Sequence, residues 1–286
     1  MEIGIGLPTT IPGAGGDELL AWAKRGEDLG FSSLGVLDRL MYDSYEPLIT
    51  LAAAAGATSR IRLTTSILIA AYRGDQVVLA KQLASLHRLS GGRLVVSVAA
   101  GPREDDYEAC GTPFHRRGRR LDDLLGELRR LWAGAASPGL VPGPSCVNGG
   151  PPLIVGGHSE AAMRRAATYG DGWIAGGSSA SGYDALAQRA RTAWQAAGRT
   201  GEPRMLAIAY VALGADAREA AGRYLTEYYA FAGPKADMAV RSMLTDERQL
   251  REFADGYEAS GCDELILIPC VTDVGQADRI AKAVWG

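Results

Sequence analysis

The residues best suited to chemistry form a short apolar run that ends in two glycines and a polar pair. They are Leu153, Ile154, Val155, Gly156, Gly157, His158 and Ser159. A helix-forming stretch follows from Glu160, so the pattern predicts a strand, a tight turn and a helix N-terminus. Glycines let backbone approach a ligand, and the free N–H groups of a helix N-terminus favour an anion. The segment predicts a seat for a cofactor phosphate; the alternative is an ordinary turn capped by Ser159. We expect Gly157→Val to abolish cofactor binding without unfolding the chain.

Few residues of the sequence are candidates for metal binding or for catalysis of hydrolysis. Of the three histidines, only His158 follows a strand; the other two are His87 and His115. No H-x-x-x-H pair and no C-x-x-C pair is present, so we predict no metal site. The four cysteines are typical of a reduced, cytoplasmic chain. The run 104–106 consists of one Glu and two Asp, and predicts either a general base or a solvated edge.

Composition excludes several partners. The net charge of −3 and pI of about 5.7 do not favour nucleic acid or an anionic membrane. The most apolar helix-like run, residues 48–57, is too short to span a bilayer. We therefore expect a cytoplasmic protein that acts on a small molecule.

The elements that would position these residues alternate regularly. Apolar runs of strand length occupy residues 3–7, 33–37, 60–69, 93–99, 152–155, 171–175, 205–213 and 264–269. Helical patterns occupy residues 17–30, 47–58, 76–89, 118–132, 161–167, 183–197, 215–225, 247–260 and 274–284. Continuous apolar strands separated by helices indicate parallel pairing. Eight such units predict a single-domain (β/α)8 TIM barrel over residues 1–286, with insertion loops near 135–151 and 226–246. A doubly wound open sheet is the alternative.

Four stretches carry a resemblance to a known family. They are residues 65–73, residues 80–94 with their Leu-Ser-Gly-Gly-Arg-Leu ending, residues 111–122, and residues 152–173. In order and spacing they resemble the luciferase-like superfamily of flavin- and deazaflavin (F420)-dependent oxidoreductases. The resemblance implies a barrel with the cofactor ring at the carboxyl ends of the strands.

The resemblance also assigns roles to individual residues. It places the ring beside Asp38, Gly101 and a bulge or non-prolyl cis peptide at Ser66–Ile67. It places the cofactor phosphate on the turn of Val155, Gly156, Gly157, His158 and Ser159. Glu104 matches the loop after the fourth strand. Candidate catalytic residues are therefore Asp38, Arg39 and Glu104. Aromatic residues of the variable loops predict either an apolar substrate surface or simple packing; they are Tyr42, Tyr72, Tyr228, Tyr229 and Phe231.

Arg39 departs from the family pattern, in which many members carry His at that position. A guanidinium stays protonated and cannot act as a base near neutral pH, although it can stabilise negative charge. Three functions remain open: a monooxygenase using reduced FMN, an F420-dependent dehydrogenase or reductase, and a non-catalytic flavin-binding member. Few cations are predicted at the mouth beyond Arg39, Arg73 and Arg103, which favours FMN over F420. The resemblance further implies a homodimer and a separate flavin or F420 reductase.

Overall fold

The chain folds as a closed barrel of eight parallel strands, as the sequence predicts. The structure is a computed structural model that describes residues 1–134, 143–177 and 179–286. Each strand pairs with its sequence neighbour, and the first strand pairs with the last. The strands are β1 (Glu2–Gly6), β2 (Ser33–Val36), β3 (Arg62–Ile69), β4 (Leu94–Ala99), β5 (Leu153–Gly156), β6 (Gly172–Ala175), β7 (Arg204–Val211) and β8 (Glu264–Pro269).

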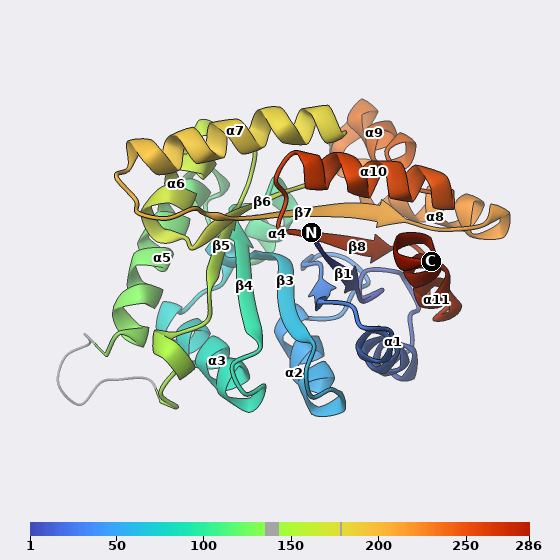
Figure 1. The fold of residues 1–286 in the computed structure, drawn as a ribbon. Coiled ribbons are helices and arrows are strands. Elements are labelled where there is room, and N and C mark those ends of the chain that lie inside the picture. The colour runs from blue at the N-terminus through green and yellow to red at the C-terminus, as the bar shows by residue number, and fades with distance from the viewer. Residues whose placement is uncertain (135–142, 178) are drawn as a thin grey trace.

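Helices surround the barrel, and Figure 1 shows them ranged around the strands. The longer helices are α1 (Gly16–Leu29), α2 (Pro47–Ala57), α3 (Gln76–Leu89), α5 (Arg117–Trp132), α6 (Glu160–Tyr169), α7 (Ala180–Ala196), α8 (Ala215–Tyr228), α10 (Glu247–Ala259) and α11 (Gly275–Trp285). Short helices are α4 (Glu104–Ala109), α9 (Ala236–Arg241), and the 3-10 segments η1 (Ala70–Tyr72), η2 (Phe114–Arg116), η3 (Val147–Gly149) and η4 (Ala230–Lys235). Among the described residues, no helix has the length and apolar character needed to cross a bilayer.

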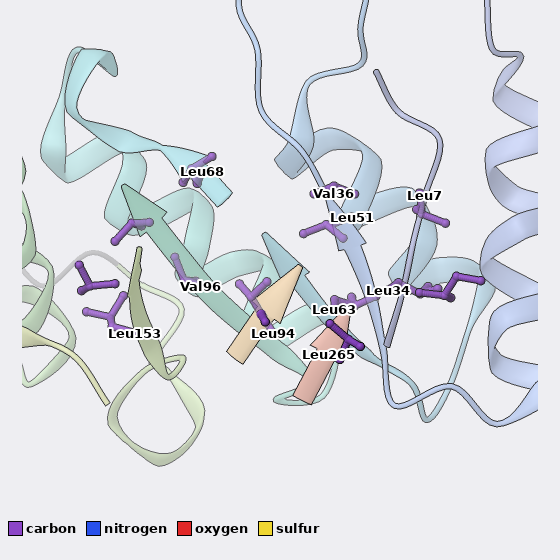
Figure 2. Packing of buried hydrophobic residues seen from close by; sticks show 14 of the residues in the cluster. Leu7, Leu34, Val36, Leu51, Leu63, Leu68, Leu94, Val96, Leu153 and Leu265 are labelled. Atoms are coloured by element: carbon purple, nitrogen blue, oxygen red, sulfur yellow. The ribbon is translucent and has the colours of Figure 1, made fainter. Parts of the chain in front are cut away.

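The strands are buried on both faces, which explains their unbroken apolar sequence. Alternate strand residues belong to two clusters. The outer one packs strands against helices, and Figure 2 shows Leu34, Leu63, Val96 and Leu153 within it. The inner one fills the barrel and contains Ile154, Ile174, Leu206, Ile208 and Ile266, among others. Burying each such side chain contributes about 1.5–3 kcal/mol relative to leaving it exposed.

One of the two predicted insertion loops has regular secondary structure. Residues 135–142 of the first lie outside the described residues. The second, residues 226–246, is largely helical, with the end of α8, then η4 and α9, instead of a loop. Its Leu244 also forms a parallel bridge with Val211 at the end of β7. The helical segments are too short to show a clear 3.6-residue period, and Gly233 (φ +56°) breaks the pattern between them.

Candidate functional site

A cavity of about 640 Å³ lies at the carboxyl ends of the strands. It is lined by segments that follow β2 to β7 and by the end of α8 with η4. Nine of the residues singled out in the sequence as catalytic or cofactor-binding line it, namely Asp38, Arg39, Ser66, Ile67, Gly101, Gly156, Gly157, His158 and Ser159. A larger hollow of about 920 Å³ lies between α8, α10 and α11, but exposed charged side chains line most of it. The barrel-end cavity is therefore the better candidate site.

The turn after β5 has the predicted form of an anion seat. Ser159 caps α6, because its hydroxyl accepts from the Ala162 N–H at 3.2 Å. The Trp173 indole donates to the Gly157 carbonyl at 2.9 Å and holds the turn in place. Within the described part of the chain, the N–H groups of His158 and Ser159 have no hydrogen-bond acceptor. These donors at the start of a ten-residue helix are suited to a phosphate.

Gly157 has a second constraint that the sequence does not reveal. Its φ is +128°, and a Cβ atom there would lie 2.8 Å from the Cβ of Ala162. A valine at position 157 would therefore strain the backbone as well as fill the phosphate position, so loss of cofactor binding in Gly157→Val would not by itself locate the phosphate. Variants at other cavity residues test cofactor binding more cleanly.

The irregularity predicted in the third strand is a β-bulge. The register between β3 and β4 shifts between Thr65 and Leu68, around Ser66 and Ile67. The one cis peptide bond recorded in the described residues is Gly143–Pro144, far along the chain from this strand. A Cβ at Gly156 would lie 2.4 Å from Cδ1 of Ile67, so the glycine makes room for the bulge. A bulge re-aims side chains at a barrel rim.

The cavity fits a flavin-type cofactor in the chemistry of its donors. The Ser66 hydroxyl is buried without a partner among the described residues, at the bulge. The free N–H groups of the β5–α6 turn face a different part of the same cavity. Gly101, which lines the cavity just after β4, has φ +70°, and a Cβ there would lie 2.8 Å from Cγ2 of Ile69, so the position requires glycine. A hydrogen-bonding wall and an anion seat in one cavity match a polar ring that carries a phosphate.

Asp38 is a buried carboxylate held by three donors. The Ile69 N–H donates to it at 2.8 Å, the Tyr72 hydroxyl at 3.0 Å and the Arg73 guanidinium at 3.1 Å. Burial raises the pKa of Asp38, while these three donors act to lower it. Tyr72 does not line the cavity; it lies behind Asp38, and burial raises the pKa of its hydroxyl. The arrangement fixes Asp38 in the cavity wall.

Arg39 and Arg103 share one buried carboxylate, that of Asp106. The Nε atoms of the two arginines lie 3.9 and 3.7 Å from Oδ2 of Asp106, and its Oδ1 accepts from the Met41 N–H at 2.8 Å. Asp106 lines the cavity, whereas Glu104 is exposed and does not. The reason is helical: these residues form α4, which turns position 104 outward and position 106 inward. The acidic candidate therefore moves from Glu104 to Asp106.

The aromatic candidates divide into two groups. Tyr228, Tyr229 and Phe231 line the cavity, together with Tyr210, which the sequence did not single out. Tyr42 does not line it; the ring packs edge-on against Tyr228 at 5.5 Å between centroids. The hydroxyls of Tyr210 and Tyr229 are 2.7 Å apart, and burial raises the pKa of both. Tyr42 and Tyr72 are thus supporting residues, while the other aromatics form the wall.

Three further observations were not accessible from the sequence pattern. Arg117 and Arg165 line the cavity from α5 and α6, although neither follows a strand. Val155, predicted with the phosphate turn, is buried in the outer cluster and does not line the cavity. Alternation along β5 explains this, because Ile154 belongs to the inner cluster and its neighbour points the other way.

The closed parallel barrel with a cofactor-sized cavity at its carboxyl rim defines a TIM-barrel enzyme of the cofactor-binding kind. The chain belongs to the luciferase-like monooxygenase family, whose model matches residues 1–284. This is a family of flavin- and F420-dependent oxidoreductases.

Two mycobacterial proteins are similar to part of the chain. An uncharacterized protein of Mycobacterium tuberculosis is 33% identical over 211 residues, 62% of this chain and 72% of that protein. The F420-dependent hydroxymycolic acid dehydrogenase of the same species is 30% identical over 202 residues, 64% of this chain and 55% of that protein.

Two solved structures share the fold over nearly the whole length. An F420-dependent secondary alcohol dehydrogenase has a TM-score of 0.81 at 20% identity, covering 99% of this chain and 97% of that one. The monooxygenase RslO1 from Streptomyces bottropensis has a TM-score of 0.77 at 20% identity, with the same coverage. At these identities the likeness concerns the fold.

Proposed function

We propose that this chain is an F420-dependent oxidoreductase acting on a small organic substrate. The observation that carries the proposal is the presence on the cavity wall of Arg117 and of Arg165, which also pairs with Asp122. F420 has a long anionic tail, and the sequence alone predicted too few cations at the mouth to hold it. Charged donors bind anionic oxygens more strongly than neutral ones. The F420-dependent mycobacterial relative supports the same assignment.

Different residues of the cavity would bind different parts of the cofactor. The N–H groups of His158 and Ser159, with Arg117 nearby on the wall, would hold the phosphate. The bulge at Ser66–Ile67 would support the ring, and the Ser66 hydroxyl would hydrogen-bond to it. When bound, the cofactor supplies two-electron redox chemistry. These fixed donors would set the position of the cofactor in the cavity.

The remaining residues set the conditions for the reaction. Arg39 keeps its proton near neutral pH and stabilises negative charge on the substrate. The hydrogen-bonded Tyr210 and Tyr229 hydroxyls hold a proton at the cavity wall, because burial keeps both phenols protonated. Tyr228 and Phe231 exclude water beside them. A polarising cation beside a phenolic donor is an arrangement suited to reducing a carbonyl or oxidising an alcohol.

Equilibrium titration of the purified protein with F420 and with FMN tests the proposal. We expect F420 to bind at least about tenfold more tightly, since its tail meets more cations than a single phosphate can. Arg117→Met should weaken F420 binding, whereas Arg223→Met, at an exposed site on α8, should not. Tighter binding of FMN, or equal F420 binding by Arg117→Met and the unmodified protein, would contradict the assignment.

A specific observation favours a second candidate, a monooxygenase that uses reduced FMN. The wall formed by Tyr210, Tyr228, Tyr229 and Phe231 is aromatic, and its Tyr210 and Tyr228 are buried; buried aromatic side chains keep water from oxygen-reactive chemistry. Oxygen uptake with reduced FMN and a panel of aromatic substrates distinguishes the two. Substrate-dependent oxygen uptake would favour the monooxygenase; its absence, with F420 turnover, favours the dehydrogenase. In our proposal a separate reductase supplies reduced cofactor to the monooxygenase, or to the F420-dependent enzyme when it reduces its substrate.

We further propose that the protein is a homodimer. Large apolar side chains are exposed on the loop before α2 and on the neighbouring helices α2 and α3: Leu40, Met41, Tyr45, Ile49, Val77 and Val78. The two helices lie side by side on the same flank of the barrel (Figure 1). Exposed apolar side chains gathered on one flank mark an interaction surface, and a second copy would cover it.

A further inference from the structure

The corner of the cavity formed by Arg39 and Arg103 carries an excess of positive charge. Two guanidinium groups face one carboxylate, that of Asp106, and neither Nε reaches hydrogen-bond distance of it. The side chains of Arg39 and Asp106 are 5% and 2% exposed, and that of Arg103 is 11% exposed. Asp105 also accepts a hydrogen bond from Arg103, but its side chain is 45% exposed and does not line the cavity. The buried part of the cluster therefore has a net charge of +1.

Donors in this corner are left without partners. The Nε–H groups of Arg39 and Arg103 are both buried and have no acceptor among the described residues. The terminal nitrogens of Arg39 are used instead, because they donate to the carbonyls of Tyr228 and Met41 at 3.1 and 3.3 Å. Those bonds fix the guanidinium in place. An unsatisfied buried donor costs free energy, and a ligand acceptor would remove that cost.

The pKa of Arg39 reflects its buried position beside Arg103. Burial, and secondarily the charge of Arg103, lower the pKa of Arg39. The two like charges repel one another in this desolvated corner, where Asp106 is the carboxylate that they share and the more exposed Asp105 pairs with Arg103. An anion placed between the two arginines would relieve the repulsion.

Aromatic rings surround the same corner. The guanidinium carbon of Arg39 lies 4.6 Å from the Tyr42 ring centre and 5.1 Å from that of Tyr228. The Arg103 guanidinium lies 4.5 Å from the ring centre of Phe231. Of these rings, Tyr228 and Phe231 also line the cavity. A ligand bound here meets cations at one end and flat apolar surfaces around them.

We infer that the substrate is an organic carboxylate with an aromatic or apolar body, and that Arg39 and Arg103 together bind its carboxylate. The inference rests on the function proposed above and names the substrate class of that cavity. A carboxylate accepts two N–H groups at once, and both arginines line this corner of the cavity. The phosphate seat lies at the start of α6, on a different segment of the wall, so the two anionic groups would not compete. Arg39 is a specificity-determining residue in this arrangement.

Calorimetric titration with two matched probes tests the inference. Phenylacetate and phenylacetamide have the same ring and nearly the same shape, but only the first is an anion. We expect the protein to bind phenylacetate at least about tenfold more tightly, since two charged donors engage it. The titration is run on the cofactor-free protein and again in the presence of saturating F420.

Variants identify the residues responsible. Arg39→Met and Arg103→Met should each reduce the affinity for phenylacetate about tenfold and leave that for phenylacetamide nearly unchanged. Arg223→Met removes an exposed arginine and should change neither. Arg39 also donates to two backbone carbonyls, so its removal costs stability; Arg103 donates to the Asp105 side chain instead. If the Arg39 variant unfolds, the Arg103 variant still shows whether this corner binds phenylacetate.

The outcomes separate this inference from the proposed function. Equal affinity for the two probes, or no measurable binding of either, would overturn it. Loss of F420 affinity in both arginine variants, with phenylacetate binding retained, would also overturn it, because the corner would then serve the cofactor. Failure of the unmodified protein to bind F420 would contradict the proposed function alone, since the comparison of probes on cofactor-free protein would still stand.

Discussion

Arg39 governs which acid–base chemistry the cavity supports. Where many family members carry a histidine that exchanges protons near neutral pH, this chain has a guanidinium that does not. Its two terminal nitrogens are held by backbone carbonyls, and its Nε faces a shared carboxylate. The residue therefore acts through charge and position, and proton transfer falls to the nearby phenols in our proposal.

Substitutions of Asp38 and Arg73 test how much their pairing stabilises the cavity wall. Asp38→Asn keeps the shape and an oxygen for the Ile69 N–H but loses the charge opposite Arg73. We expect a loss of about 1–3 kcal/mol in the free energy of unfolding. Arg73→Met should cost more, about 3 kcal/mol or above, because it leaves a carboxylate buried without its cation. Urea unfolding measures both; a reversed order, or no change in either, would contradict the pairing.

At the scale of elements, short contacts tie neighbouring βα units together. Glu27 on α1 accepts hydrogen bonds from the backbone N–H groups of Ser59, Arg60 and Ile61, which lead into β3. This carboxylate couples the first helix to the third strand. Burial acts to raise the pKa of Glu27, but the N–H donors outweigh it and hold the pKa at about 2.

The depressed pKa of Glu27 predicts a pH dependence of stability. A carboxyl whose folded-state pKa lies below its ordinary value of 4.5 stabilises the fold above pH 4.5. That contribution is lost as the pH falls from 4.5 towards 2. Glu27→Gln should therefore lower the free energy of unfolding by about 1–2 kcal/mol at pH 7. The difference between variant and parent should shrink below pH 4.

Denaturant unfolding at several pH values measures this effect. Glu219→Gln serves as a control, because Glu219 is exposed and pairs only with Arg223 one turn along α8 among the described residues. Its loss should change stability by less than about 0.5 kcal/mol at any pH. A Glu27 variant whose deficit stayed constant from pH 7 to pH 2 would refute the assigned role of the N–H donors.

At the scale of the whole molecule, the two ends of the barrel differ: one carries a network of ion pairs and the other carries the cavity. At the amino ends of the strands, Arg62 and Arg204 both pair with Glu2 and with the buried Glu264. This closed network satisfies charges at the end opposite the cavity. At the carboxyl end, the cavity-lining Arg39, Ser66 and Arg103 each have a buried donor without a partner among the described residues, as a ligand site does.

The proposed homodimer gives a prediction at the same scale. Ile49→Asp combined with Val78→Asp puts two charges into the apolar patch on α2 and α3. We expect the dimer dissociation constant to rise at least about a hundredfold, because unpaired charges would be buried at the interface. Leu89→Asp, at the far end of α3 and equally exposed to solvent, should leave it unchanged. Sedimentation velocity measures the masses, and a monomeric parent protein would rule the dimer out.

Features that depend on neighbours along the chain were predictable from the sequence. Continuous apolar runs and helical periods indicated eight parallel strands with intervening helices and favoured the closed barrel, which the structure confirms, over an open sheet. The turn at Gly156–Gly157 was predictable for the same reason, since glycines and a capping Ser159 act locally. Strand ends in a parallel barrel share one rim, so Asp38 and Ser66 could be placed near that turn.

Features that depend on side-chain direction and on helices crossing the rim required the folded structure. Because α4 is helical, Asp106 and not Glu104 faces the cavity. Tyr42 and Tyr72 pack behind the residues that line it. Arg117 and Arg165 reach the cavity from helices whose sequence pattern marks neither as special. A linear sequence encodes which faces are apolar, but the charge of a cavity is the sum of groups that only three-dimensional packing brings together.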